Sequence, residues 1–132
     1  MTPGRGATPD RAAPSGRDER FRPHERIRTR AEYVAVYDRG RRVSGRLMTV
    51  FLLENGLARP RLGIAATRKF GSAVQRNRAK RFVREAFRRH KPGSGLDIVV
   101  VPKRELNDAG FGLVETEYLA AIGRRAGRPR GA

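Results

Sequence analysis

Apolar residues recur along the chain in two patterns, one with a period of three to four residues and one that alternates or runs continuously. In the segment TRAEYVAVYDRG, Thr29 is followed three residues later by Glu32, which is the capping pattern of a helix start, and Gly40 indicates where that helix ends. Tyr33 and Tyr37 are four residues apart, so they lie on one face of the helix, one turn apart. The segment therefore predicts a helix with an aromatic side.

The next segments have the pattern of strands. VSGRLMTVFLLENG alternates and then becomes continuously apolar, and its Asn55-Gly56 pair is a turn signal, so it predicts a strand, a turn and a strand. The short run RLGIAA after Pro60 predicts a further strand. The β-branched run LDIVVV from Leu96 is typical of a buried central strand.

A long basic helix is predicted between these last two strands, where Arg and Lys are dense across residues 74–91. The loop TRKFGSA before it contains Gly71 and a capping Ser72, and Pro92 stops it. Its apolar residues recur at spacings of three, four, seven and eight, which places them on one stripe of a helix. These residues are Ala79, Phe82, Val83, Ala86 and Phe87.

A last helix is predicted near the C-terminus, although Gly110 and Gly112 leave its start undefined. Its apolar residues at helical intervals are Phe111, Val114, Tyr118, Leu119 and Ile122. The order of helix, strands, helix, strand and helix predicts an α+β fold, a small two-layer sandwich.

The two ends of the chain differ from this patterned region. Residues 1–24 are rich in Pro, Gly, Ala, Arg and Asp and lack apolar periodicity, so they predict a disordered basic tail. Residues 126–132 have the same character. The folded domain is therefore expected to span residues 25–125.

Composition narrows the class of partner. The 132 residues suit one domain, and 30 Lys and Arg against 13 Asp and Glu give a net charge of +17, which favours an extended polyanion such as nucleic acid. Cysteine is absent, which excludes disulfides and cysteine-ligated zinc. No export signal and no run of about 18 apolar residues is present, so we expect a soluble cytoplasmic protein without a membrane partner.

The predicted basic helix carries the strongest charge signal. Residues 76–91 hold eight basic side chains and one acid, Glu85, and we expect no neutralising pairs within the helix. A solvated helix face usually mixes both signs, so the pattern favours a surface that binds a polyanion.

The segment RLGIAATRKFGSAVQRNRAKRFVREAFR, residues 61–88, resembles the signature of the bacterial ribonuclease P protein subunit, with its Arg-Asn-Arg helix at Arg76, Asn77 and Arg78. The resemblance extends back through AEYVAVYDRGRRVSGR and forward through LDIVVVPK, about 100 residues in all. It implies a left-handed β-α-β crossover around the basic helix, against the general right-handed preference. It also implies that this helix and the loop before it face the catalytic RNA subunit. The matching residues are Arg68, Lys69, Arg76, Asn77, Arg78, Lys80, Arg81 and Arg84.

The resemblance further implies a surface, between the first helix and the sheet, for the single-stranded 5′ leader of precursor tRNA. Bases of any identity stack on aromatic rings, and a neighbouring arginine holds the backbone, which suits leaders of varied sequence. The matching residues are Tyr33, Tyr37, Arg41, Arg42 and Phe51. The alternative is that the rings are ordinary core: the two tyrosines favour the cleft because each keeps a polar tip, and Phe51 fits either place. Many family members carry phenylalanine at one or both helix positions.

The chain itself has few groups for cutting RNA. Hydrolysis of a phosphodiester needs clustered carboxylates with metals or a positioned acid and base. His24 falls in the predicted tail, His90 ends the basic helix, and no Glu-x-Lys follows Asp97. The resemblance implies instead that the RNA subunit cuts, with Mg²⁺ held by that RNA and the substrate. The predicted function is removal of the precursor leader to give the mature tRNA 5′ end; a general RNA-binding or ribosome-associated protein is the alternative, and duplex DNA binding is least favoured.

Overall fold

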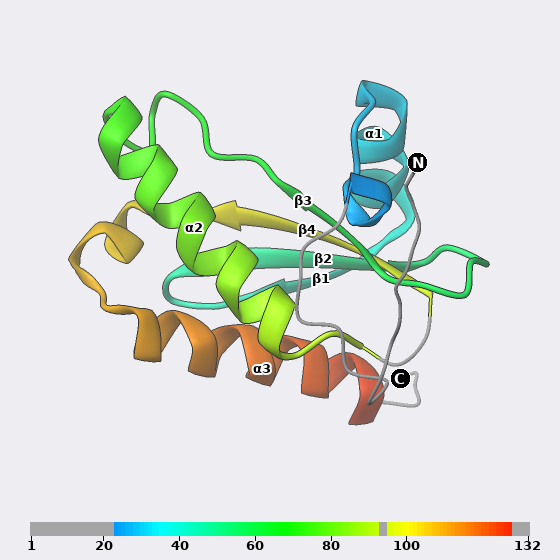
Figure 1. Ribbon diagram of the computed structural model, residues 1–132. Helices are drawn as coiled ribbons and strands as arrows, with labels where there is room; N and C mark the ends of the chain where they lie inside the picture. The colour runs from blue at the N-terminus through cyan, green and yellow to red at the C-terminus, as the bar shows by residue number, and fades with distance from the viewer. Residues whose placement is uncertain (1–22, 93–94, 128–132) are drawn as a thin grey trace, which may run out of the picture.

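The computed structural model describes residues 23–92 and 95–127, in which one α-helix precedes three consecutive strands and two further α-helices flank the fourth strand (Figure 1). Most of the two predicted tails, residues 1–24 and 126–132, lies outside these described residues. The elements in chain order are the 3-10 turn η3 (Pro23–Glu25), α1 (Arg30–Arg39), β1 (Arg41–Ser44), β2 (Met48–Glu54), β3 (Arg61–Ile64), α2 (Ala73–Arg89), β4 (Leu96–Pro102), the 3-10 turn η4 (Arg104–Asp108) and α3 (Phe111–Gly127).

The four strands form one mixed sheet in the order β1-β2-β4-β3. β2 pairs antiparallel with β1 and with β4, whereas β3 runs parallel to β4, so α2 is the connection of a β-α-β unit. The prediction that LDIVVV forms a buried central strand is confirmed. Outside β3, Arg26 makes a parallel bridge to Leu62, and the Ile27 N–H donates to the Leu62 carbonyl at 2.9 Å, so the segment before α1 covers part of the outer edge of β3.

Helices cover both faces of this sheet, because alternate residues of a strand point to opposite sides. On β4, Ile98 and Val100 belong to the large core beneath α2 and α3, whereas Val99 packs in a smaller cluster with Val36 of α1. In Figure 1, α1 lies above the strands and α3 below them. The predicted two-layer sandwich thus describes only the sheet with α2 and α3, and α1 adds a third, partial layer.

The helix boundaries follow local signals closely. Thr29 and Ser72 each form a full capping box, with Glu32 and Gln75 respectively, as the sequence of the first helix predicted. The predicted apolar stripe of α2 is confirmed, since all of its members are buried except Phe82, which is partly buried.

The predicted face of α3 is confirmed at Val114 and Tyr118, both fully buried, and wrong at Leu119. The Leu119 side chain is 41% exposed, and Ala121 takes the buried position instead. The spacing of four and then three residues from Val114 through Tyr118 to Ala121 follows one helix stripe, and Leu119 falls beside it. None of the helices in the described part of the chain has the length and apolar character needed to span a bilayer.

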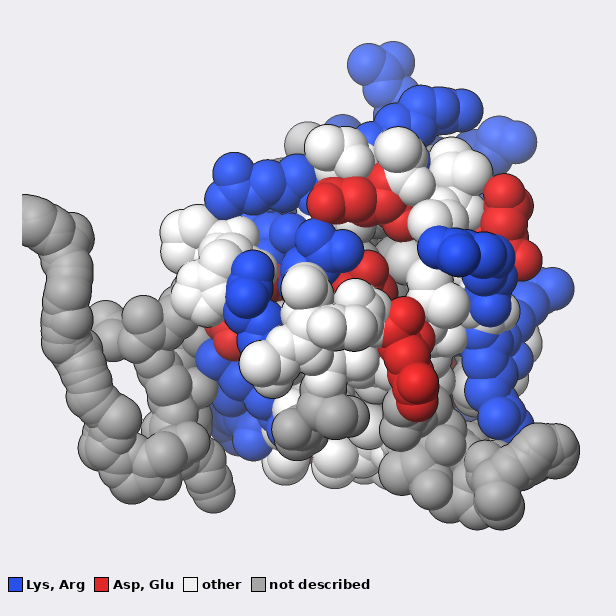
Figure 2. All heavy atoms as spheres, turned by 90° about the vertical axis from the view of Figure 1, so that its right-hand side faces the viewer, with Lys and Arg blue, Asp and Glu red and all other residues white. Residues whose placement is uncertain are grey.

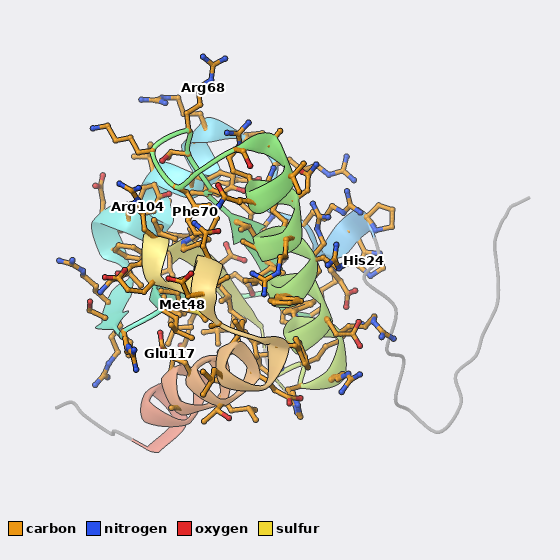
Figure 3. All side chains as sticks on the ribbon, turned by 90° about the vertical axis from the view of Figure 1, so that its left-hand side faces the viewer. His24, Met48, Arg68, Phe70, Arg104 and Glu117 are labelled. Atoms are coloured by element: carbon orange, nitrogen blue, oxygen red, sulfur yellow. The ribbon has the colours of Figure 1, made fainter. Side chains whose placement is uncertain are left out.

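The turn between β1 and β2 is fixed by a residue of α3. The carboxylate of Glu117 accepts hydrogen bonds from the backbone N–H groups of Arg46 at 3.1 Å, Leu47 at 2.9 Å and Met48 at 2.9 Å. Figure 3 shows Glu117 and Met48 close together at this end of the sheet. A Cβ atom on Gly45 would lie 2.4 Å from a carboxylate oxygen of Glu117, so a larger residue there would push this carboxylate aside.

Candidate nucleic-acid interface

Three aromatic rings form a row between α1 and the sheet. The ring centroids of Tyr33 and Tyr37 are 6.4 Å apart, and those of Tyr37 and Phe51 are 5.0 Å apart in an edge-to-face arrangement. Tyr37 is 38% exposed, and Tyr33 and Phe51 are half-buried. Tyr33 and Phe51 pack against the small cluster around Val99, and Tyr37 extends the row to the surface.

Tyr33 is held against the edge strand β3. Its ring lies over Gly63, where a Cβ atom would be 2.7 Å from the Tyr33 hydroxyl oxygen and 2.8 Å from two ring carbons. Its hydroxyl also hydrogen-bonds the backbone of Ile64. Burial raises the pKa of both Tyr33 and Tyr37 above the usual value, so both phenols stay neutral at physiological pH.

The strand register separates the two arginines predicted beside these rings. Arg42 of β1 pairs with Phe51 of β2, so its side chain lies on the same face of the sheet as that ring. Arg41 pairs with Leu52, which belongs to the opposite, larger core. Arg42 is therefore the arginine that the sheet places beside the aromatic row.

A basic pocket of about 470 Å³ adjoins Tyr33 between α1, β3 and α2. Lys80 and Arg84 of α2 line it from one side, and Arg26 and Arg28 of the segment before α1 line it from the other. None of the described residues that line it is acidic. Sequence reasoning missed Arg26 and Arg28, because they precede the first predicted helix; the only signal was their place next to the apolar Ile27.

The arginines of the Arg-Asn-Arg motif bond to backbone carbonyls. The Arg78 Nη2 donates to the Ala109 oxygen at 2.6 Å, its Nη1 is 3.4 Å from the Asn107 oxygen, and its guanidinium lies 4.5 Å from the centroid of the Phe82 ring. The Arg76 Nη1 donates to the Gly71 oxygen at 2.8 Å. Both arginines are partly exposed. A guanidinium has five N–H donors, so these bonds orient each guanidinium and leave other donors free to bind a phosphate.

The other predicted residues of this surface are exposed, namely Arg68, Lys69, Asn77 and Arg81. Arg68 projects from the loop after β3 at the end of the molecule that faces the viewer in Figure 3. Arg104, exposed on η4, lies at the same end and was not among the predicted residues. The carboxyl ends of the parallel strands β3 and β4 meet at this edge, which brings their following loops together. At the opposite end of the molecule, acidic side chains lie among the basic ones (Figure 2).

The prediction that α2 has no neutralising pairs is wrong near its C-terminus. Glu85 accepts from Arg88 at 2.6 Å and from Arg89 at 2.7 Å, and these hydrogen bonds lower the pKa of its carboxyl group. The charge available for a polyanion is thus concentrated between Arg76 and Arg84.

Arg61 connects the aromatic row to the middle of the sheet. Its guanidinium forms two bonds to Asp97, at 2.9 Å and 2.8 Å, and a third to Glu32 at 3.0 Å. Asn55 also donates to Asp97, at 2.8 Å. The Asp97 carboxylate of β4 is therefore occupied by its bonds to Arg61 of β3 and to Asn55. Backbone hydrogen bonds from Thr29 and Arg28, with a further bond to Arg61, lower the pKa of Glu32 to about 2.

The two histidines are not brought together in a catalytic arrangement. The Nε2 of His90 lies 2.7 Å from a Glu115 carboxylate oxygen, and His24 lies in η3. Within residues 23–92 and 95–127, no three His, Asp or Glu side chains are grouped as a metal site would require.

Comparison with known proteins agrees with this geometry. The family model described as ribonuclease P matches residues 21–125. The ribonuclease P protein component of Thermotoga maritima is 41% identical over 92 residues, covering 68% of this chain and 79% of that protein. The corresponding protein of Syntrophomonas wolfei is 38% identical over 104 residues, covering 77% and 87%.

Solved structures give the same result. The ribonuclease P protein from Thermotoga maritima superposes with a TM-score of 0.69 at 36% identity, covering 76% of this chain and 96% of that one. The Staphylococcus aureus protein gives a TM-score of 0.68 at 31% identity, covering 76% and 95%. The chain therefore belongs to the family of bacterial ribonuclease P protein components and is a protein subunit of this endoribonuclease, which matures the 5′ end of tRNA.

Proposed function

We propose that the chain grips the single-stranded leader of precursor tRNA in the groove between α1 and the sheet, while the N-terminal part of α2 and the loop before it bind the catalytic RNA. The observation that carries this proposal is the continuity of two surfaces: the row of Tyr33, Tyr37 and Phe51 leads directly into the basic pocket lined by Lys80 and Arg84. Rings that accept bases and cations that accept phosphates thus lie within one surface.

The leader site uses stacking and charge. Tyr37 has the most accessible ring of the row, Phe51 supports it from the strand, and Arg42 lies beside Phe51 to neutralise a backbone phosphate. That Arg41 binds the leader stays a prediction, and it has less support because Arg41 pairs with Leu52 and not with Phe51. Stacking tolerates any base, which suits leaders of varied sequence.

The surface for the RNA subunit uses the remaining cations. Oriented guanidinium forks match phosphate oxygens in pairs, and each neutralised phosphate releases a counterion. The residues proposed to bind this RNA are Arg68, Lys69, Arg76, Asn77, Arg78, Lys80, Arg81 and Arg84. Lys80 and Arg84 also line the pocket beside Tyr33, which supports the proposal that they contact both RNAs. A left-handed β3-α2-β4 crossover stays part of this proposal, as do residues 25–125 as the domain and the cytoplasm as its location.

We assign cleavage of the phosphodiester bond to the RNA subunit and not to the protein. Mg²⁺ is proposed to bind the RNA subunit and the substrate, and the protein contributes counter-charge and grip. The side chains support this assignment, because Asp97 is paired with Arg61 and His90 with Glu115. By reducing phosphate repulsion, the protein would let the two RNAs approach at physiological salt.

The test is reconstitution. The full chain is mixed with a bacterial ribonuclease P RNA and a precursor tRNA at a magnesium concentration at which the RNA alone is slow. Accurate cleavage at the mature 5′ end is expected, and the Arg76→Ala, Arg78→Ala double variant is expected to bind the RNA subunit more weakly with a flatter salt dependence. A chain that binds both RNAs without restoring accurate cleavage would instead be a general RNA-binding protein, and the proposal would fail.

A further inference from the structure

Arg61 joins three elements that meet at the leader groove. It is the first residue of β3, and its guanidinium bonds to Asp97 of β4 through two nitrogens, at 2.9 Å and 2.8 Å. The third bond, from Nη1 to Glu32 Oε2 at 3.0 Å, reaches the first turn of α1. The Asp97 side chain is 6% exposed and the Arg61 side chain 19%, so the contact between Arg61 and Asp97 is largely shielded from water.

Helix α1 meets the sheet through few side chains. Among its ten residues only Val36 is fully buried, and the rings of Tyr33 and Tyr37 add partly exposed contacts. The Arg61–Glu32 pair adds the ionic contact at the N-terminal end, beside the backbone bond of Ile27 to β3. Both carboxylate oxygens of Glu32 are used, because Oε1 accepts from the backbone of Arg28 and Thr29 while Oε2 bonds to Arg61.

The position of the N-terminal end of α1 determines where the tyrosine rings lie relative to the strands. Tyr33 follows Glu32 directly, and its ring fits over Gly63 with no room for even a methyl group beneath it. A shift of α1 by one ångström would therefore move the Tyr33 ring off β3, widen the basic pocket and change the angle of Tyr37 to Phe51. Small displacements of positioned groups have large effects on recognition.

We infer that Arg61, acting through Glu32, is a positioning residue of the leader groove, which sets how far the tyrosine rings of α1 stand from the strands. This inference rests on the proposed binding of the leader in that groove. Arg61 touches no RNA in this role, since its forks are occupied by Asp97 and Glu32.

The variant that tests it is Glu32→Gln. A glutamine keeps a carbonyl oxygen for the capping bonds to Arg28 and Thr29, and it removes the negative charge that Arg61 binds, while Arg61 and Asp97 stay paired. Glu105→Gln is the matched control, because Glu105 is an exposed acid on η4 and its loss changes net charge by the same amount. Arg61→Lys is a second variant that keeps the charge and loses the fork.

The measurement is the affinity of the reconstituted holoenzyme for precursor tRNA and for mature tRNA, which lacks a leader. Glu32→Gln is expected to weaken precursor binding about five- to tenfold, part of the effect of losing a base stacked on a ring, and to leave mature tRNA and RNA-subunit affinity unchanged. In a Tyr37→Ala background the same substitution is expected to add little, because both changes act on one contact. Glu105→Gln should keep the wild-type preference for precursor over mature tRNA.

Three outcomes contradict the inference in different ways. If Tyr37→Ala lowers the preference for precursor but neither Glu32→Gln nor Arg61→Lys does, the leader groove exists and Arg61 does not position it. If the effects of Glu32→Gln and Tyr37→Ala simply add, Arg61 acts elsewhere. If Tyr37→Ala itself leaves the preference intact, the proposed leader site is wrong and the inference falls with it.

Discussion

The ring of Tyr37 meets the ring of Phe51 edge to face, with 5.0 Å between the two centroids, although one residue comes from helix α1 and the other from strand β2. The contact holds Tyr37 in place from one side while its side chain stays 38% exposed. A ring that is fixed but open is a ready platform for a base, since little ordering entropy is lost when the base binds.

Replacing Tyr37 by alanine should therefore weaken binding of precursor tRNA by about 1 to 3 kcal/mol, the usual contribution of one stacked base, and leave binding of mature tRNA unchanged. Tyr37→Phe keeps the ring and should behave like the wild type. Val34→Ala is the control, because Val34 is exposed on the same helix and carries no ring. Equal losses for precursor and mature tRNA would show that Tyr37 supports the fold and not the leader.

Arg78 and Arg81 should separate into two roles. Arg78 bonds to the carbonyls of Asn107 and Ala109, so Arg78→Ala should lower the free energy of unfolding by about 1 to 3 kcal/mol and also weaken RNA binding. Arg81 is exposed, so Arg81→Ala should change stability by less than about 0.5 kcal/mol and reduce the slope of log affinity against log salt by about 1.

Urea unfolding and salt titrations of RNA-subunit binding measure both quantities. Arg78→Lys is informative here, because it retains the charge and loses the fork: it should unfold more easily with nearly the wild-type salt slope. An unchanged unfolding midpoint for Arg78→Ala would mean that the two carbonyl contacts contribute nothing to the native state.

Acid should release the N-terminal end of α1. The folded pKa of Glu32 is about 2, below the ordinary value of 4.5, so its ionised form is favoured by folding. The stability that comes from Glu32 is complete above about pH 5 and is lost as the pH falls towards 2. The difference in unfolding free energy between the wild type and Glu32→Gln should therefore shrink over this range in urea titrations. A difference independent of pH would show that the carboxylate charge is not what stabilises this end.

Structural features that depend only on residues close together in the chain could be predicted from the sequence. The capping box at Thr29 and Glu32, the capping serine at Ser72 and the apolar stripe of α2 each involve residues within one or a few helical turns, and the structure agrees with all of them. The aromatic spacing of Tyr33 and Tyr37 also needed only helix periodicity.

Features that join distant segments were not accessible in this way. Arg61 and Asp97 are 36 residues apart, and nothing in either segment marks them as partners. The pairing of Arg42, and not Arg41, with Phe51 depends on strand register, which one residue of slippage would reverse. The basic pocket takes cations from two segments that only the folded chain brings together.

The bond between Glu117 and the first hairpin has a consequence for biosynthesis. The amides of that turn are made about seventy residues before the carboxylate that receives them, so a ribosome has already produced the whole basic helix by the time the hairpin can be secured. A message cut short ahead of codon 117 would yield a polypeptide with nearly all of its RNA-binding cations but without the carboxylate that bonds three amides of the β1–β2 turn. Synthesis of the last helix is thus the step that supplies the final bonds to the turn between β1 and β2.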